Sequence, residues 1–215
     1  MQIGAPGHKG SEMNPLIETE VKIAVADLNA IRERLEAVGA VLRAPRVFER
    51  NIRYEDAAGS LTPNEIVLRL RQDTAARLTY KAPPDAEAAQ PANVRTRFEA
   101  EVTVSDFDTM DVILQRLGFR PHVVYEKFRT TYQLGEAEVV LDEMPFGPFV
   151  EVEGPADAIG RALDRLGLAD APRILVSYLA LFERVKAALK LDAHDLTFDN
   201  FAGVIVPPEV FVGHH

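Results

Sequence analysis

The sequence contains no cysteine and no tryptophan, and no apolar run reaches the roughly 18 residues that a membrane-spanning helix needs. The absence of cysteine excludes disulfide scaffolds, zinc–thiolate sites and cysteine nucleophiles. Bases are in the minority, since 24 Lys and Arg stand against 33 Asp and Glu, for a net charge of −9. An overall basic surface of the kind that binds nucleic acid is therefore absent. No charged-then-apolar leader is visible, so we expect a cytoplasmic protein with neither a membrane nor a nucleic-acid partner.

The 215 residues are 47% apolar and 27% charged, which is typical of a globular chain with one core. Residues 1–14 are punctuated by Gly and Pro, and we expect a flexible leader there. Residues 15–190 are assigned to a single domain, within which the Ala- and Pro-rich stretch 83–93 is interpreted as a long loop. Residues 191–215 are apolar but interrupted, so we expect a C-terminal tail that ends in His214 and His215.

Two amphipathic helices are predicted, each after a strand that carries the pattern Glu-x-Glu. Asp27 caps the first helix and Gly39 closes it, whereas Gly118 closes the second. This weak internal repeat predicts two strand–helix–strand units related by a pseudo-two-fold axis. A helical section is also predicted over residues 159–185.

Charged residues occupy one face of seven expected strands, since side chains alternate between the two faces of a strand. In the first strand, for example, Glu18, Glu20 and Lys22 share one face, and Val21 and Ile23 occupy the other. Over the seven strands these faces carry nine bases and nine acids, namely Lys22, Arg69, Arg71, Arg77, Lys81, Arg95, Arg97, Lys127 and Arg129, with Glu18, Glu20, Glu65, Glu99, Glu101, Glu138, Asp142, Glu151 and Glu153.

Two interpretations fit this pattern. For any single strand, an antiparallel sheet with a solvated, salt-bridged outer face is the simpler one. For all seven strands together, a barrel closed around its charges, with helices on its apolar outer face, explains why Arg and Glu dominate. Enclosed charges need partners: clustered carboxylates bind divalent cations, and Arg binds phosphate through paired contacts. The second interpretation therefore predicts a metal–polyphosphate complex inside a tunnel.

An ordered series of short motifs resembles the CYTH, or triphosphate tunnel metalloenzyme, superfamily. The series consists of Glu18-Thr-Glu20-Val-Lys22, Val67-Leu-Arg69-Leu-Arg71, Tyr80-Lys81, Arg97-x-Glu99-x-Glu101, Glu126-Lys127-x-Arg129, Leu141-Asp142 and Phe149-Val-Glu151-Val-Glu153-Gly154. The resemblance covers residues 16–190 and is strongest to the class IV adenylate cyclase branch, which Ser177-Tyr178-Leu179 also resembles. It implies an α+β fold, an eight-stranded antiparallel β-barrel (the triphosphate tunnel) with helices packed outside.

The resemblance also implies roles for individual residues. Glu18, Glu20 and Glu153 would hold a catalytic Mg²⁺ or Mn²⁺, and Glu99, Glu101, Asp142 and Glu151 would bind a second ion or orient bases. The triphosphate would be bound by Arg69, Arg71, Lys81, Arg97, Lys127 and Arg129. Lys22 would contact phosphate or assist the nucleophile. By contrast, Tyr54, Tyr80, Tyr125 and Tyr132 are interpreted as packing residues of the strands, although one could contact a nucleobase.

The implied activity is cleavage of a phosphoanhydride bond in a small-molecule triphosphate: ATP, tripolyphosphate or thiamine triphosphate. Two reactions remain open. In a cyclase the ribose 3′-hydroxyl of ATP attacks the α-phosphorus, whereas in a hydrolase water attacks the γ-phosphorus. An alternative of another class is a non-catalytic binder of polyphosphate or nucleotide, which needs the bases but not Glu18, Glu20 and Glu153. The sequence is also compatible with a homodimer.

Overall fold

The computed structural model describes residues 17–84 and 93–212. The expected leader, most of the loop at 83–93 and the two terminal histidines lie outside the described residues. The elements in chain order are β1 (Ile17–Ala24), α1 (Leu28–Ala37), β2 (Val41–Glu55), β3 (Val67–Gln72), β4 (Ala76–Ala82), β5 (Arg95–Val104), α2 (Phe107–Arg116), β6 (Arg120–Leu134), β7 (Ala137–Met144), β8 (Gly147–Glu153), α3 (Ala156–Leu166), α4 (Tyr178–Leu189) and the 3-10 turn η1 (Pro208–Val210). No described helix is long and apolar enough to cross a membrane.

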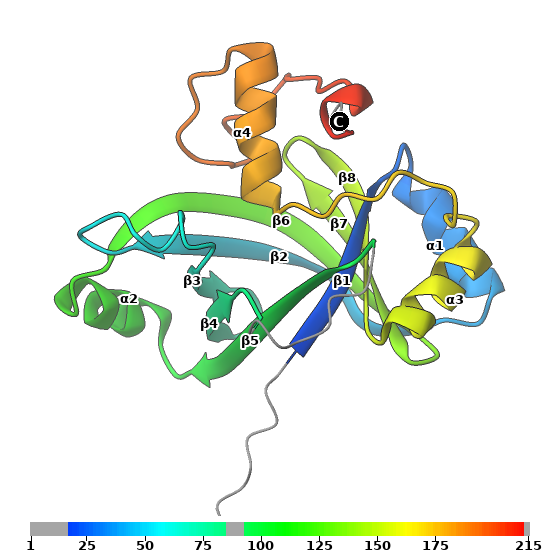
Figure 1. Ribbon diagram of the computed structural model, residues 1–215, viewed down its shortest axis with the longest axis horizontal. Coiled ribbons are helices and arrows are strands. Elements are labelled where there is room, and N and C mark those ends of the chain that lie inside the picture. The colour runs from blue at the N-terminus through cyan, green and yellow to red at the C-terminus, as the bar shows by residue number, and fades with distance from the viewer. Residues whose placement is uncertain (1–16, 85–92, 213–215) are drawn as a thin grey trace, which may run out of the picture.

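The eight strands close into one antiparallel barrel in the order β1-β5-β4-β3-β2-β6-β7-β8, and β8 pairs with β1. The expected eight-stranded antiparallel barrel is confirmed. β2 and β6 are 15 residues long and form a ribbon that curves across the molecule (Figure 1). β2 is the strand that the charge pattern did not reveal, because most of its first eight residues are exposed and their polarity does not alternate.

The internal repeat corresponds to a symmetry of the barrel. The halves run β1-α1-β2-β3-β4 and β5-α2-β6-β7-β8. If every strand is exchanged for its counterpart in the other half, β1 for β5, β2 for β6, β3 for β7 and β4 for β8, the same set of neighbouring strand pairs results. Gly39 and Gly118 follow the two equivalent helices with φ of 74° and 98°, a backbone conformation that glycine adopts without strain. The two predicted strand–helix–strand units are therefore confirmed.

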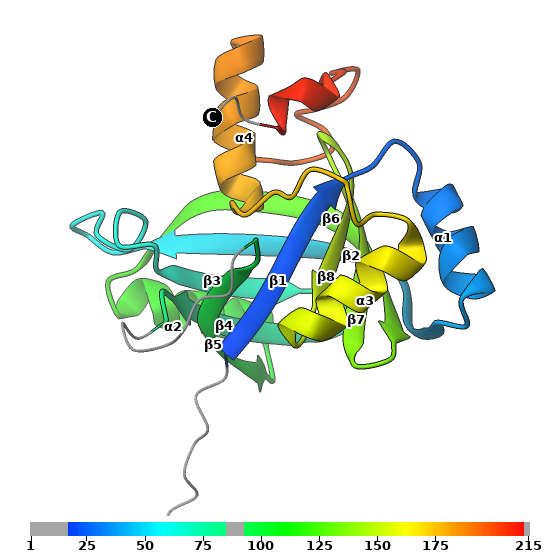
Figure 2. The ribbon, with the colours of Figure 1, turned by 45° about the vertical axis from the view of Figure 1, so that its right-hand side comes forward.

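Alternation along the strands separates an apolar outer face from a charged inner face. In β1, Val21 and Ile23 pack into a core with the apolar faces of α1 and α3, whereas Glu20 and Lys22 line the lumen. α1 and α3 lie together at one side of the barrel and α2 at the other (Figure 2). The helices thus cover apolar surface that would otherwise face water, and the charges are enclosed.

The C-terminal section differs from the expected helix and tail. α3 and α4 are separate helices joined by residues 167–177, and the chain after α4 folds back beside it (Figure 1). Leu196, Phe201 and Phe211 are at most 5% exposed and pack with Phe182 of α4. Residues 192–212 are thus part of the packed fold. The sequence pattern did not predict this, because irregular turns separate the buried residues and no period of 2 or 3.6 relates them.

Candidate functional site

The lumen of the barrel holds a cavity of about 1040 Å³. Thirteen of the site residues predicted from the sequence line it: Glu18, Glu20, Lys22, Arg69, Arg71, Lys81, Arg97, Glu99, Glu101, Lys127, Arg129, Glu151 and Glu153. The remaining one, Asp142, is fully buried behind Lys127 and Arg129, which contact it. Closure of the barrel therefore brings together residues from β1, β3, β4, β5, β6, β7 and β8.

Three carboxylates gather on adjacent strands, and we call Glu18, Glu20 and Glu153 the acid cluster. Glu18 and Glu20 share the inner face of β1, and Glu153 on β8 lies opposite Glu20. One carboxylate oxygen from each residue lies within 4.8 Å of the others. Burial raises the pKa of Glu153 to about 8, and the carboxylates of Glu18 and Glu20 act in the same direction. Burial also raises the pKa of Glu18.

The acid cluster fits a hard divalent cation. Its donors are all carboxylate oxygens, the ligands that Mg²⁺ and Mn²⁺ prefer. Burial, together with the neighbouring carboxylates, raises the pKa of Glu153 and so favours its protonated form, and a bound cation would favour the charged form instead. Within residues 17–84 and 93–212, no other set of three or more His, Asp and Glu side chains approaches as closely.

The other four acids assigned to metal binding each lie against a base. Lys81 Nζ lies 3.0 Å from Glu99, and Arg71 donates to Glu101 at 3.0 Å. Asp142 and Glu151 both contact Arg129. These positions match the second of the two expected roles, which is the orientation of bases. A second metal ion held by these acids stays a prediction.

Five cationic side chains, which we call the base wall, line the cavity from β3, β4 and β6: Arg69, Arg71, Lys81, Lys127 and Arg129. Each is fixed by a neighbour. Arg69 donates to the hydroxyl of Thr79 at 3.0 Å, and Arg129 donates to both oxygens of Asp142 at 2.7 and 2.6 Å. Fixed guanidinium groups are suited to paired contacts with phosphate oxygens.

Arg97 is the predicted phosphate ligand whose guanidinium is already engaged by the main chain. It donates to the carbonyl of Ala82 at 3.1 Å and also to the carbonyl of Glu65. Burial lowers the pKa of Arg97, and the nearby charge of Arg95 adds to this effect. The geometry shows Arg97 fastening the chain at the ends of β3 and β4, and phosphate binding by this residue stays a prediction.

Lys22 lies beside the acid cluster and is only 2% exposed. Its Nζ lies 2.6 Å from Glu151 Oε1. Burial alone would lower the pKa of Lys22, but the carboxylates of Glu151 and Glu20 outweigh burial and raise it. A protonated amine cannot take a proton from a nucleophile, so of the two expected roles this charge state disfavours general-base catalysis, and phosphate contact stays a prediction.

β2 contributes three residues to the inner face that the sequence analysis missed: Glu49, Asn51 and Arg53, which pair in register with inner-face residues of β6 or β3. Glu49 carboxylate oxygens lie 3.6 Å from Lys127 Nζ and 3.9 Å from an Arg71 nitrogen. Burial alone would raise the pKa of Glu49, but Lys127 and the neighbouring guanidinium groups lower it to about 2. The alternation Glu49-x-Asn51-x-Arg53 is the signal that could have located this strand.

The four tyrosines interpreted as strand packing have different surroundings. Tyr54 and Tyr132 are buried in apolar clusters outside the lumen, as predicted, and Tyr80 is 40% exposed. Tyr125 instead lines the lumen, where its hydroxyl accepts a hydrogen bond from Arg69 at 3.3 Å.

α4 supplies one side of the cavity. Its cap, Ser177, accepts a hydrogen bond from the Ala180 N–H at 3.2 Å. The next residue, Tyr178, donates from its hydroxyl to Asp142 at 2.9 Å. Leu175 and Val176 add apolar surface on the same side. The cavity thus combines a charged lumen with an apolar margin.

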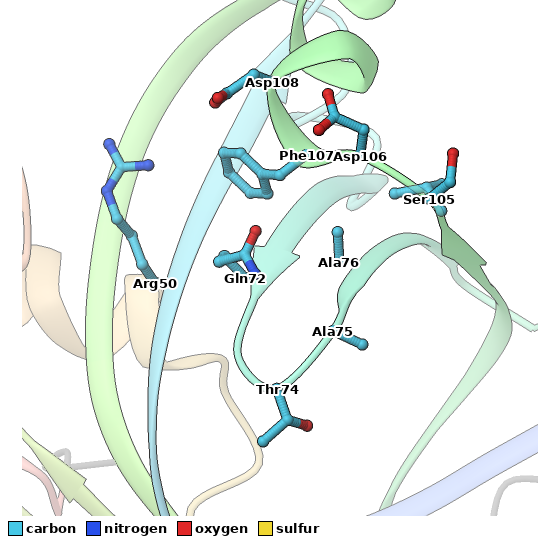
Figure 3. Close-up of a pocket in the computed structure, with 10 residues that line it drawn as sticks. Arg50, Gln72, Thr74, Ala75, Ala76, Ser105, Asp106, Phe107 and Asp108 are labelled. Carbon is cyan, nitrogen blue, oxygen red and sulfur yellow. The ribbon is translucent and has the colours of Figure 1, made fainter.

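A second hollow of about 630 Å³ lies outside the lumen, between the β3–β4 turn and the start of α2 (Figure 3). Arg50, Gln72, Asp106, Phe107 and Asp108 are among its lining residues. The carboxylate of Asp106 is engaged as the cap of α2, since it accepts from the Thr109 N–H at 2.7 Å. This hollow gathers no set of acids or bases comparable to the lumen, and we assign the chemistry to the lumen.

Comparison with known proteins gives the same fold. A candidate adenylate cyclase of Methanocaldococcus jannaschii is 28% identical over 140 residues, which cover 64% of this chain and 77% of that protein. The structure of a candidate adenylate cyclase from Vibrio parahaemolyticus matches with a TM-score of 0.68 at 18% identity, over 78% of this chain and 98% of that one. The structure of a Hippeastrum candidate adenylyl cyclase, described as having a dominant triphosphatase activity, matches with a TM-score of 0.56 at 19% identity, over 77% of this chain and 95% of that one.

The sequence itself matches the CYTH domain pattern over residues 16–162. That range contains all eight strands of the barrel and every residue of the acid cluster and the base wall. The chain belongs to the CYTH domain family.

Proposed function

We propose that this protein is a metal-dependent enzyme that cleaves a phosphoanhydride bond of a triphosphate in the lumen of the barrel. One observation carries the proposal: the acid cluster and the base wall line the same cavity. The base wall is suited to the negative oxygens of a triphosphate. The acid cluster is suited to a divalent cation, Mg²⁺ or Mn²⁺, which when bound would polarise phosphoryl oxygens and neutralise charge.

The residues of the chain have little covalent work to do in such a reaction. Phosphoryl and nucleotidyl transfer depend mainly on alignment of the substrate and on stabilisation of developing charge. Arg71 and Arg129 are already held by carboxylates, so they need little rearrangement to face a substrate. Lys22, kept protonated by Glu151, adds a further positive charge beside the acid cluster.

Cyclisation of ATP to cyclic AMP and pyrophosphate is the reaction that we propose first. Leu175, Val176 and Ile66 give the cavity an apolar margin. Such a margin suits the organic part of a nucleotide and offers nothing to tripolyphosphate. The names of the Methanocaldococcus and Vibrio relatives support the same choice.

Hydrolysis of tripolyphosphate or thiamine triphosphate is the second candidate. The same base wall would serve it, and the description of the Hippeastrum protein supports it. A non-catalytic binder of polyphosphate or nucleotide is less well supported, because binding alone gives no reason to crowd Glu18, Glu20 and Glu153.

Product analysis tests the proposal. The protein is incubated with Mg²⁺ or Mn²⁺ and with ATP, tripolyphosphate or thiamine triphosphate in turn. Cyclic AMP with pyrophosphate identifies a cyclase, and release of orthophosphate identifies a hydrolase. Tight binding without turnover of any of the three would identify a binder and overturn the enzymatic proposal.

A further inference from the structure

We infer that Tyr178 is a positioning residue of the triphosphate site, acting through Asp142 and Lys22. The inference rests on the proposed function. Tyr178 lies beyond residues 16–162, over which the sequence matches the CYTH domain pattern, and belongs to the segment Ser177-Tyr178-Leu179 that resembles the cyclase branch. It is the first residue of α4 and is 8% exposed.

The hydroxyl of Tyr178 is one of three donors to a single buried carboxylate. It donates to Asp142 Oδ2 at 2.9 Å. Lys127 donates to the same oxygen at 3.1 Å, and Arg129 donates to both oxygens at 2.7 and 2.6 Å. Asp142 has no exposed surface, so its orientation depends on these donors alone among the described residues. The phenol therefore helps to set the carboxylate against which two members of the base wall are aligned.

The ring of Tyr178 also faces two ammonium groups. Lys22 Nζ lies 4.4 Å and Lys127 Nζ 5.6 Å from the ring centroid, both within the range of a cation–π interaction. Lys22 is on β1 and Lys127 is on β6, so one side chain contacts bases from two strands and an acid from a third. A residue that only filled space in the core would need neither the hydrogen bond to Asp142 nor the contacts with the ammonium groups of Lys22 and Lys127.

The chain on both sides of α4 is hydrogen-bonded to the strands that carry these bases. Before α4, the Ile174 N–H donates to the carbonyl of Lys22 at 2.8 Å. After α4, Leu196 pairs with β6, since its N–H donates to Val124 and its carbonyl accepts from Glu126, both at 2.9 Å. The segment 174–196 thus joins β1 to β6 and holds Tyr178 between them.

Binding of tripolyphosphate with Mg²⁺, measured by titration calorimetry on the full chain, tests the inference. Tyr178→Phe keeps the ring and removes the hydroxyl, and we expect affinity to fall about 3- to 10-fold. Tyr178→Leu removes both, and we expect a loss of about 30-fold or more. Since Tyr178→Leu could fail to fold, Tyr178→Phe is the deciding variant.

The matched control is Tyr54→Phe. Tyr54 is also buried and donates to a carboxylate, Asp111 at 2.7 Å, but it lies outside the lumen. We expect Tyr54→Phe to lower the melting temperature and to leave tripolyphosphate affinity within about 2-fold of wild type. In an Asp142→Asn background, Tyr178→Phe should lose most of its effect on affinity, because the phenol acts through Asp142.

Two results would overturn the inference, and they differ from each other. If the wild-type protein binds tripolyphosphate and Tyr178→Phe binds it equally well, Tyr178 only packs and the proposed function survives. If the wild-type protein itself fails to bind tripolyphosphate with Mg²⁺, the proposed function fails and the inference falls with it.

Discussion

At the scale of single residues, the lumen pairs most of its acids with a base, Arg95 with Glu20 at 3.6 Å among them, and Glu153 of the acid cluster is an exception. Lys81 lies 2.6 Å from Glu18, but no described base lies within 4.0 Å of the Glu153 carboxylate. Paired charges offset the cost of burial, whereas crowded carboxylates hold protons or need a cation.

Replacement of Glu20 by Gln tests the acid cluster. We expect turnover of ATP with limiting Mn²⁺ to fall at least about 100-fold, because one of the three proposed metal ligands is lost. The metal-free protein should melt at the same or a higher temperature, since removal of one carboxylate relieves like-charge repulsion. Glu33→Gln on the exposed face of α1 is the control and should change neither quantity. Undiminished turnover in Glu20→Gln would contradict the metal assignment.

Replacement of Glu49 by Gln tests the base wall through pH. The pKa of Glu49 is about 2 in the folded protein, against an ordinary value of 4.5. A lowered pKa stabilises the fold above about pH 4.5, and the contribution is lost as pH falls toward 2. We expect Glu49→Gln to reduce the free energy of unfolding by about 1–3 kcal/mol at pH 7.

Urea unfolding of Glu49→Gln and wild type at pH 7, 5 and 3 provides the measurement. The difference between the two proteins should be constant from pH 7 to about pH 5 and clearly smaller at pH 3. A difference that does not change with pH would mean that the Glu49 carboxylate is not paired with Lys127 and its neighbouring guanidinium groups.

At the scale of elements, the end of β8 sets the position of Glu153. The next residue, Gly154, has a φ of 143°, and its N–H donates to the carbonyl of Thr19 at 3.0 Å. A Cβ at this position would lie 3.1 Å from the carbonyl oxygen of Glu136. Glycine therefore allows β8 to leave the barrel wall while Glu153 faces Glu18 and Glu20.

Replacement of Gly154 by Ala tests this arrangement. We expect a loss of about 1–3 kcal/mol in the free energy of unfolding, from backbone strain and the close contact. Mn²⁺ affinity should fall as well, because Glu153 moves with the strand end. Gly160→Ala is the matched control, since Gly160 lies within α3 with open space around its Cα, and it should be neutral or stabilising by about 0.5–1 kcal/mol. If Gly154→Ala and Gly160→Ala had the same free energy of unfolding and the same Mn²⁺ affinity, the end of β8 would not constrain the position of Glu153.

The elements predicted from the sequence are those with a clear period. In β1 the charged residues fall at every second position, so both its presence and its inward face could be predicted from Glu18, Glu20 and Lys22. The charged inner face of β2 was missed because the first half of the strand is exposed on both faces, and with it the analysis missed Glu49, Asn51 and Arg53 as site residues. The role of residues 192–212 could not be predicted either, because their burial depends on α4 and on turns without periodicity.

At the scale of the whole molecule, a chain with a net charge of −9 offers a polyanion a concentrated set of bases. The closed barrel collects them from strands that are far apart in sequence, as β3 and β6 are. The sequence predicted this gathering from composition and alternation, but the pairing of each acid with its base needed the strand register. The central claim is that the acid cluster and the base wall act together on one ligand.

Thermal unfolding with and without ligands tests that claim most directly. Mg²⁺ and tripolyphosphate added together should raise the melting temperature by several degrees, since a ligand at about 100 times its dissociation constant adds roughly 2.7 kcal/mol. The joint shift should exceed the sum of the two separate shifts, and sodium chloride at equal ionic strength should have almost no effect. In the Glu20→Gln variant, the joint shift in melting temperature should no longer exceed the sum of the two separate shifts. Equal shifts from salt and from Mg²⁺ with tripolyphosphate would contradict the account.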